Sequence, residues 1–259
     1  MSDARRAPVW VVIPAYCEER LITRAIANVP ALVSRIVVVD DASPDHTANF
    51  ARASEDPRVT VLCRATNGGV GAAIIDGYRY FVDATVEDAA VCVIMAGDAQ
   101  MDSGDLPALL AAIESGADYA KGNRFLMRGT FRAMPVIRWV GNRFLSCITS
   151  WVTGLPIGDS QCGYTAITRS ALCKLPLERL YARYGFPNDV LVKLAAADLV
   201  VHDVAVRAVY ADEVSGLSPW RVGPRILGIL WRGRSEISAA RRDRNRLRVS
   251  ARVRDASVR

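Results

Sequence analysis

Acidic residues at the ends of predicted strands are the side chains of this sequence best suited to do chemistry. Asp40 and Asp41 follow one apolar run, Asp98 follows another, and Asp159 lies further along the chain. The carboxyl ends of parallel strands share one edge of a sheet, so we expect these carboxylates to converge there. Such an edge can accept hydrogen bonds from a base or ribose and can hold a divalent cation against a diphosphate. Taken singly, each Asp could instead be a cap or turn residue.

The run at residues 91–95 is apolar throughout, which is typical of a buried strand, and Asp98, Gln100 and Asp102 follow it. A cation site is one interpretation of these three residues. The other is that they cap the helix expected to begin near Gly104, because Asp is a favoured N-cap residue.

Strands and helices alternate along the first half of the chain. Strands are expected at residues 8–15, 35–39, 58–63, 91–95 and 118–121, and helices between them include 18–29, 71–82 and 106–115. This alternation indicates an α/β fold with a mainly parallel, Rossmann-like sheet flanked by helices. Beyond residue 122 an amphipathic helix is expected at 136–152 and a last strand near 200–209.

The glycine-rich segment 67–73, NGGVGAA, follows a predicted strand and opens a predicted helix. Its backbone amides could approach a phosphate, and Gly71 is the residue that we assign to nucleotide-sugar binding. A dinucleotide fingerprint is matched only in part, since Ile74 stands where the third glycine would be. A nicotinamide-dependent oxidoreductase is therefore disfavoured, and a plain turn stays an alternative.

The composition is typical of a globular protein with a full core, since the 259 residues are 51% hydrophobic and 23% charged. No apolar run approaches the roughly 18 residues that span a bilayer, and the N-terminus lacks a signal-peptide pattern. Six cysteines without a CxxC pair favour buried thiols in a reducing compartment over a metal cage or disulfides. We therefore expect a cytoplasmic protein.

The segment 241–259 contains eight arginines and two aspartates, so it carries the whole net charge of +6. A basic tail can bind an anionic membrane surface or a nucleic acid, or it can be a solvated end. We expect residues 232–259 to be disordered. Together with the amphipathic segment 218–231, this tail is expected to attach the protein peripherally to the inner face of the plasma membrane, without a nucleic-acid partner.

Six motifs then occur in a recognisable order. They are VVIPAYCEE (11–19), VVVDDASPDHT (37–47), NGGVGAAIIDGY (67–78), VIMAGDAQMDSGDLPALL (93–110), KGNRF (121–125) and DSQCGYTA (159–166). The order resembles family 2 glycosyltransferases, and most of all the branch that includes dolichyl-phosphate mannose synthase and bacterial polyprenyl-phosphate glycosyltransferases. The resemblance covers residues 8–218. It implies a GT-A fold, a nucleotide-diphosphate sugar donor, a divalent cation and inversion at the anomeric carbon.

The resemblance assigns donor-binding roles to five residues. Pro14, Tyr16 and Glu18 match positions near the nucleotide base and ribose. Asp41, with Asp40 beside it, matches the acidic residue that reads the base.

The metal ligands implied by the resemblance are Asp98 and Gln100, for Mg²⁺ or Mn²⁺. Asp98 matches the second Asp of the family's DxD motif, and Gln100 matches the Gln that follows it. Ala96 occupies the place of the first Asp, which leaves fewer carboxylates for the cation.

On the acceptor side, Arg124 and Arg138 match arginines that hold the phosphate of the acceptor lipid, and guanidinium groups suit phosphate oxygens. The alternative is an amphipathic helix whose arginines lie in water. A phosphate acceptor needs no general base, because a phosphate monoester with a second pKa of about 6 is mostly dianionic near neutral pH.

If a base exists, Asp189 is the first candidate, in the pair Asn188-Asp189 where other family members have two acids. The alternative role for Asp189 is a helix cap. With Asp98 and Asp159 it completes the set of candidate catalytic residues.

The leading hypothesis is an inverting glycosyltransferase that moves a sugar from a nucleotide-diphosphate sugar to a polyprenyl phosphate at the cytoplasmic membrane face. One alternative is a family 2 enzyme that acts on a saccharide or small-molecule hydroxyl. Another is a non-catalytic nucleotide-sugar or membrane-surface binding module. The expected catalytic domain spans residues 1–231, with a nucleotide-sugar half at 8–123 and an acceptor half at 124–217.

Overall fold

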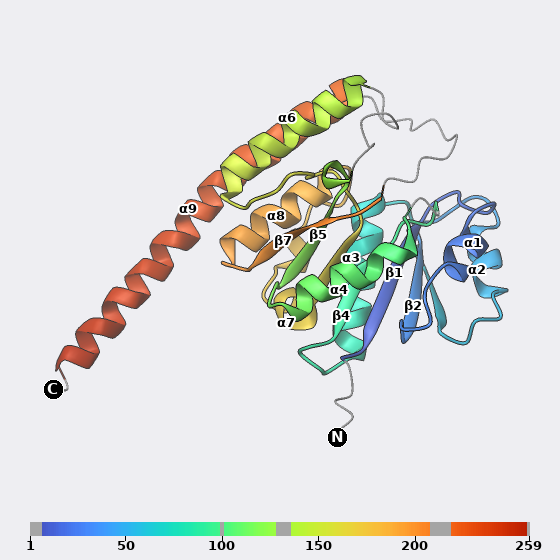
Figure 1. Cartoon of the computed structure of the whole chain (residues 1–259), viewed down its shortest axis with the longest axis horizontal. Helices are drawn as coiled ribbons and strands as arrows, with labels where there is room; N and C mark the ends of the chain where they lie inside the picture. Colours follow the sequence, from blue (N-terminus) through green and yellow to red (C-terminus); the bar gives the residue numbers. More distant parts are fainter. Residues whose placement is uncertain (1–6, 99–100, 128–135, 208–218, 258–259) are drawn as a thin grey trace.

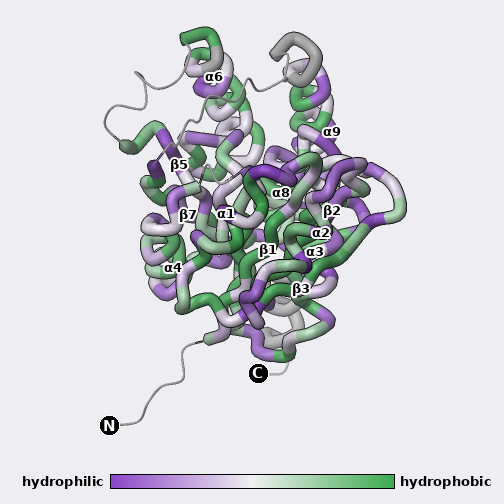
Figure 2. The backbone as a smooth tube through the Cα atoms, turned by 90° about the vertical axis from the view of Figure 1, so that its right-hand side faces the viewer, coloured by the Kyte–Doolittle hydropathy of each residue, from purple (hydrophilic) through white to green (hydrophobic). Residues whose placement is uncertain are grey.

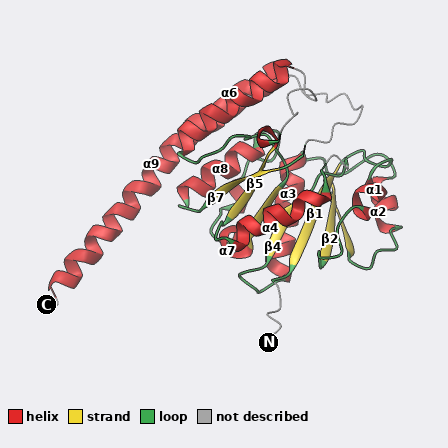
Figure 3. Ribbon diagram, in the orientation of Figure 1, coloured by secondary structure: helices red, strands yellow, loops and turns green. Residues whose placement is uncertain are grey.

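Among the described residues, seven strands form one sheet in the order β3-β2-β1-β4-β6-β5-β7 (Figure 3). The computed structural model describes residues 7–98, 101–127, 136–207 and 219–257. The strands are β1 (Val9–Ala15), β2 (Arg35–Asp40), β3 (Val59–Cys63), β4 (Val91–Ile94), β5 (Tyr119–Asn123), β6 (Thr165–Thr168) and β7 (Val201–Ala205). The expected α/β fold with a mainly parallel sheet is confirmed.

The one departure from parallel pairing is β6, which runs antiparallel to both β4 and β5. This strand was not expected, because its sequence TAIT is short and polar at both ends. Through β6 and β7, the segment after residue 124 joins the sheet begun by the first half of the chain.

Helices cover both faces of the sheet (Figure 1). The helices are α1 (Ile22–Ala27), α2 (Thr47–Arg52), α3 (Val70–Ala84), α4 (Leu106–Glu114), α6 (Val136–Thr153), α7 (Arg169–Leu172), α8 (Phe186–Ala196) and α9 (Pro219–Ser257). Short 3₁₀ turns lie at Ser103–Asp105, Arg124–Leu126 and Leu177–Arg179.

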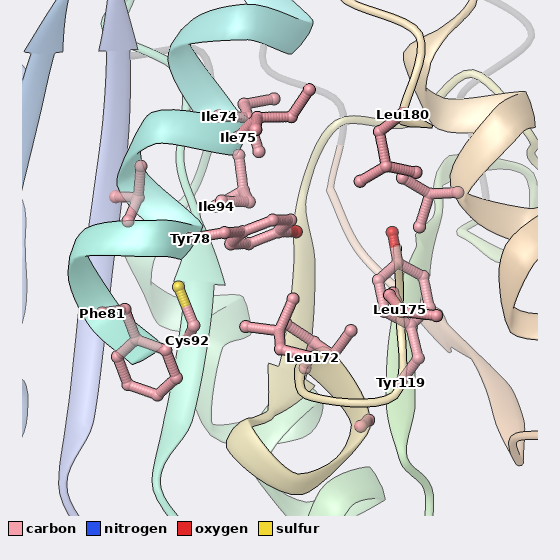
Figure 4. Close-up of a cluster of buried hydrophobic side chains, with 14 of the residues drawn as sticks. Ile74, Ile75, Tyr78, Phe81, Cys92, Ile94, Tyr119, Leu172, Leu175 and Leu180 are labelled. Carbon is pink, nitrogen blue, oxygen red and sulfur yellow. The ribbon is translucent and has the colours of Figure 1, made fainter. Parts of the chain in front are cut away.

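Alternate residues of the central strands feed two separate cores, because successive side chains of a strand point to opposite faces. One core lies under α3, α7 and α8, where Tyr78 and Phe81 pack with Cys92 and Ile94 of β4 (Figure 4). The other lies under α1, α2 and α4. Hydrophobic residues accordingly concentrate in strands such as β1 (Figure 2). A sheet buried on both faces explains why its strands read as continuous apolar runs.

A third apolar cluster joins α6, α8 and α9. It buries Ile226 and Leu230 against Val192 of α8, whereas Leu227 and Trp231 of the same segment stay exposed, so membrane attachment through residues 218–231 stays a prediction. The described tail beyond residue 232 is helical rather than disordered. The first half of α9 is held in place by its packing on α6 and α8, which provides the helix nucleus. Each further residue then adds a backbone hydrogen bond at little cost. Within the described residues, no helix combines the length and apolar composition needed to cross a membrane.

Candidate active site

The carboxyl end of β1 brings the acidic strand ends together. The carbonyl oxygen of Ala15 accepts the amide N–H of Asp41 at 2.9 Å. On the other side of β1, Gly97 lies so close that a Cβ on it would be 3.3 Å from the carbonyl oxygen of Pro14 and 3.5 Å from Cγ of Glu18. Asp41 and Asp98 therefore flank the same strand end, as expected. The convergence of Asp159 with these two carboxylates stays a prediction.

Asp41 organises the glycine-rich loop before α3. Its Oδ1 accepts the amide N–H of Gly68 at 2.9 Å, and its Oδ2 accepts that of Gly69 at 2.7 Å. The Arg64 Nε lies 3.3 Å from Oδ1, and Asp41 is only 2% exposed. These two loop amides thus donate to a carboxylate of the protein itself, which favours the plain turn over a phosphate cradle at Gly68 and Gly69.

Gly71 contacts a second loop rather than open space. A Cβ at this position would lie 2.6 Å from the carbonyl oxygen of Tyr181 and 2.8 Å from that of Ala182. Glycine is therefore required here for the close approach of α3 to the segment before α8. A nucleotide-binding role for Gly71 stays a prediction.

The loops after β1 and β2 hold left-handed backbone at non-glycine residues. Both Cys17 and Ala42 have φ of 58°, a conformation that is uncommon for side-chain-bearing residues and concentrates at functional sites. Between them, Asp40 is buried, with Oδ2 accepting the Ser43 amide at 3.2 Å and Oδ1 lacking a hydrogen-bond partner among the described residues. Tyr16 is 48% exposed at this edge, so its ring is accessible to a ligand.

Of the two predicted metal ligands, Gln100 lies outside the described residues, and the metal-binding role of Asp98 stays a prediction. Asp98 is half-buried at the end of β4. Asp102 takes the capping role, because its carboxylate accepts the Gly104 amide at 2.8 Å and pairs with Arg207 at 2.7 Å. No group of three His, Cys, Asp or Glu side chains able to hold a metal occurs in the part of the chain that the structure describes. A single carboxylate fits a cation that arrives with a diphosphate, since Mg²⁺ commonly uses one or two carboxylates together with substrate phosphates.

Arg124, which directly follows β5, and Asp159 form a bidentate ion pair. The Asp159 Oδ2 accepts from Nε at 2.7 Å, and Oδ1 accepts from Nη2 at 3.1 Å. Asp159 is fully buried. Burial alone would raise the pKa of this carboxyl, but the hydrogen bonds and charge of Arg124 outweigh it and hold the pKa below its usual value. Asp159 thereby fixes the plane and position of the Arg124 guanidinium.

Two charged groups next to this ion pair, the buried Lys121 and the partly buried Asp203, escaped the sequence analysis. Lys121 of β5 is fully buried and donates to the carbonyl oxygen of Cys162, and burial lowers its pKa. Asp203 of β7 accepts from the Asn123 side chain at 2.7 Å and from the Gly158 amide at 2.6 Å, and burial raises its pKa. Lys121 lies within the KGNRF motif. The sequence feature that could have identified it is a charged residue inside a predicted strand.

The pair Asn188-Asp189 is split between two sides of α8. Asn188 is buried and accepts from the Gln161 side chain at 3.0 Å, so the amide, not the acid, faces the turn that begins at Asp159. Asp189 accepts the Tyr181 amide at 2.8 Å, and burial raises its pKa. With Lys193, it lines a cavity of about 610 Å³ between α8 and α9.

The second predicted acceptor arginine, Arg138, lies on α6, and its side chain is not described. Arg143 of the same helix contacts the segments that bear Arg124 and Asp159: its Nη1 donates to the Gly158 carbonyl at 3.2 Å, and its Cζ lies 5.5 Å from the Phe125 ring centre. These two contacts hold α6 next to Arg124 and Asp159.

Residues 10–174 match the family described as Glycosyl transferase family 2. The chain belongs to this family. The glycosyltransferase is 33% identical over 196 residues to the undecaprenyl-phosphate mannosyltransferase of Micrococcus luteus, covering 72% of this chain and 77% of that protein. It is also 33% identical over 193 residues to the polyprenol monophosphomannose synthase of Mycolicibacterium smegmatis, covering 70% and 69% of the two chains.

Solved structures give the same fold for the glycosyltransferase. Glucosyl-3-phosphoglycerate synthase from Mycobacterium tuberculosis in complex with UDP aligns with a TM-score of 0.66 and 21% identity, covering 88% of this chain and 80% of that one. A complex of the same synthase with Mn²⁺, UDP and its product aligns with a TM-score of 0.63 and 19% identity, with the same coverage. The fold is therefore GT-A.

Proposed function

We propose that this glycosyltransferase moves a sugar from a nucleotide-diphosphate sugar to a polyprenyl phosphate, with inversion at the anomeric carbon, at the cytoplasmic face of the plasma membrane. Two relatives at 33% identity are named as transferases or synthases that act on polyprenyl phosphates, which supports this acceptor class. The observation that carries the proposal is the Arg124 guanidinium held by the buried carboxylate of Asp159, because a guanidinium fixed in this way suits the oxygens of an acceptor phosphate.

A phosphate acceptor suits this arrangement. Near neutral pH a phosphate monoester is mostly dianionic, so an oxygen can attack without a base. The attacking oxygen forms a bond to the anomeric carbon as the bond to the diphosphate breaks, and the electron pair leaves with the nucleoside diphosphate. Attack from the face opposite the leaving group inverts the configuration. Arg124, held by Asp159, would bind the acceptor phosphate in the orientation needed for attack.

The sugar donor would bind across the carboxyl ends of β1, β2 and β4. The exposed ring of Tyr16 can stack on the base, and Asp41 fixes the loop beside it. Asp98, with Gln100, would hold a Mg²⁺ or Mn²⁺ ion, whose charge stabilises the departing diphosphate. The solved Mn²⁺ and UDP complex of a GT-A neighbour supports a divalent cation in this fold.

A hydroxyl acceptor is the second candidate, because burial raises the pKa of Asp189 in the direction that a general base requires. The position of Asp189 beside the 181–183 segment and α9, rather than toward Asp159, argues against it.

A radiolabelled-donor screen tests the proposal. The protein, Mn²⁺ and labelled nucleotide sugars are incubated with a short-chain polyprenyl phosphate, with the corresponding polyprenol as the hydroxyl control. We expect label in the lipid extract with the phosphate and none with the polyprenol. Label on the polyprenol, or donor binding without any transfer, would contradict the proposed acceptor or the proposed catalysis.

A further inference from the structure

The outward face of α6 carries a row of exposed apolar side chains. Val140, Phe144 and Trp151 are 53%, 60% and 68% exposed, and Cys147 between them is also exposed. Spacings of four, three and four residues place these side chains on one face of the helix. The row is therefore a continuous stripe rather than scattered surface residues.

This stripe is not the face with which α6 packs on the protein. Leu145, Ile148 and Val152 make that contact, against Ile226 and Leu230 of α9. The helix thus has two apolar sides, of which the described structure covers one.

Exposed apolar side chains of α9 lie beside the stripe of α6 and widen it. Leu227 and Trp231 are 41% and 78% exposed, and Arg234 follows on the same helical face. The Arg234 Cζ lies 4.7 Å from the centre of the Trp151 ring, so the two rows meet. α6 and α9 lie side by side along one flank of the molecule (Figures 1 and 2). We call this combined area, formed by Val140, Phe144, Trp151, Trp231 and Arg234 with their neighbours on the two rows, the α6–α9 face.

The charge of the α6–α9 face is one-sided. The α6 sequence contains no Asp or Glu, whereas Arg143 and Arg234 stand at the border of the stripe. Exposed Trp and Phe with arginines beside them are the composition of a helix that lies in the plane of an anionic bilayer, since the rings enter the headgroup boundary and the guanidinium groups meet lipid phosphates.

We propose that the α6–α9 face docks flat on an anionic lipid bilayer. This inference deepens the proposed function, because it names the surface through which the enzyme meets the membrane that carries its acceptor. The Arg143 contact with Phe125 fastens α6 to the segment that bears Arg124. Docking through α6 therefore brings the Arg124–Asp159 pair to the headgroup level, where an acceptor phosphate would lie.

Vesicle co-sedimentation tests the docking. The full chain and a Phe144→Asp/Trp151→Asp variant are mixed with vesicles of phosphatidylcholine and phosphatidylglycerol, with Val86→Asp as the matched control because Val86 is 86% exposed away from this face. We expect wild type and Val86→Asp to bind equally, and the double variant to bind at least about tenfold more weakly, since each buried ring contributes on the order of a tenfold change in affinity. Unchanged melting temperatures would exclude misfolding.

Equal vesicle binding by the double variant, or no vesicle binding by the wild type, would overturn the proposal. So would a wild-type dimer that the double variant converts to a monomer, because a second copy would then cover the face. In detergent with a short-chain acceptor, we expect the double variant to transfer sugar at the wild-type rate. A wild type that binds vesicles but glycosylates no polyprenyl phosphate would refute the proposed function and leave the docking intact.

Discussion

At the scale of single residues, the ion pair of Asp159 and Arg124 makes a prediction about acceptor binding. Asp159→Asn keeps the size of the side chain but removes the charge and one of the two acceptors that orient the guanidinium. We expect the KM for the phosphate acceptor to rise at least about tenfold, with the KM for the sugar donor nearly unchanged. Asp88→Asn is the matched control, because Asp88 pairs with Arg169 while 79% exposed. Equal increases in both KM values would argue for a general structural defect.

The same ion pair predicts how stability depends on pH. The pKa of Asp159 is lower in the folded protein, so its contribution is present above the unfolded pKa of about 3.9 and is lost as the pH falls through the folded value. Urea unfolding of wild type and Asp159→Asn should therefore give free energies that differ at pH 6 and converge at lower pH. A constant difference across this range would show that the charge of Asp159 contributes nothing.

Asp189 decides between the two acceptor classes. As a general base it would contribute about a hundred- to ten-thousandfold to the rate. Asp189→Asn retains an oxygen that can accept the Tyr181 amide, so the local fold should persist. We expect kcat with a polyprenyl phosphate to fall by less than about tenfold, with the pH–rate profile unchanged. A loss in the range expected of a base, in a variant with a normal melting temperature, would refute the base-free reaction.

At the scale of elements, the contact between α3 and the segment before α8 limits what can replace Gly71. An alanine Cβ there would press on the Tyr181 and Ala182 carbonyls, which are backbone atoms and cannot rotate away. We expect Gly71→Ala to lower the free energy of unfolding by about 1–3 kcal/mol. Gly141→Ala in α6 is the control, since its Cβ would meet nothing within 4 Å and should stabilise the helix by about 0.5–1 kcal/mol. Denaturant midpoints of both variants check the comparison.

Six of the seven described strands, and the sheet edge at which Asp41 and Asp98 meet, could be predicted, because buried strands leave apolar runs and the carboxyl ends of parallel strands share one edge. The short antiparallel strand β6 could not. The partners of Asp41 could not, since the Gly68 and Gly69 amides depend on the exact path of a turn 27 and 28 residues away. The burial of Lys121 could not be predicted either. A charged residue in a predicted strand marks the position, but only the packing around the strand shows that the side chain is buried.

The two C-terminal helices show another limit of sequence patterns. Periodicity predicts that a helix has an apolar face, but it does not say what covers that face. The segment 218–231 was expected to meet a membrane, and the structure divides its apolar residues: Ile226 and Leu230 pack on α8, while Leu227 and Trp231 stay exposed. In α6, likewise, only the packing against α8 and α9 distinguishes the buried apolar side from the exposed stripe.

At the scale of the whole molecule, we expect the sugar donor itself to supply part of the cation site. Asp98 is a single carboxylate at the end of β4, and the described residues supply no three-ligand group for a cation. A cation should therefore bind well only when a diphosphate contributes further oxygens. Binding to the folded state alone raises stability by about 2.7 kcal/mol at a ligand concentration about a hundred times Kd.

Thermal unfolding of the whole chain measures this coupling. We expect Mn²⁺ alone to leave the melting temperature unchanged, a nucleoside diphosphate alone to raise it slightly, and the two together to raise it by several degrees. UDP and GDP should be compared, since the base is not fixed by the residues at this edge. EDTA should remove the increment, and Asp98→Asn should lose it while keeping the response to the nucleotide alone. A full increase with Mn²⁺ alone would mean that a complete cation site exists without the sugar donor, and Asp98 would then not need the diphosphate to hold the metal.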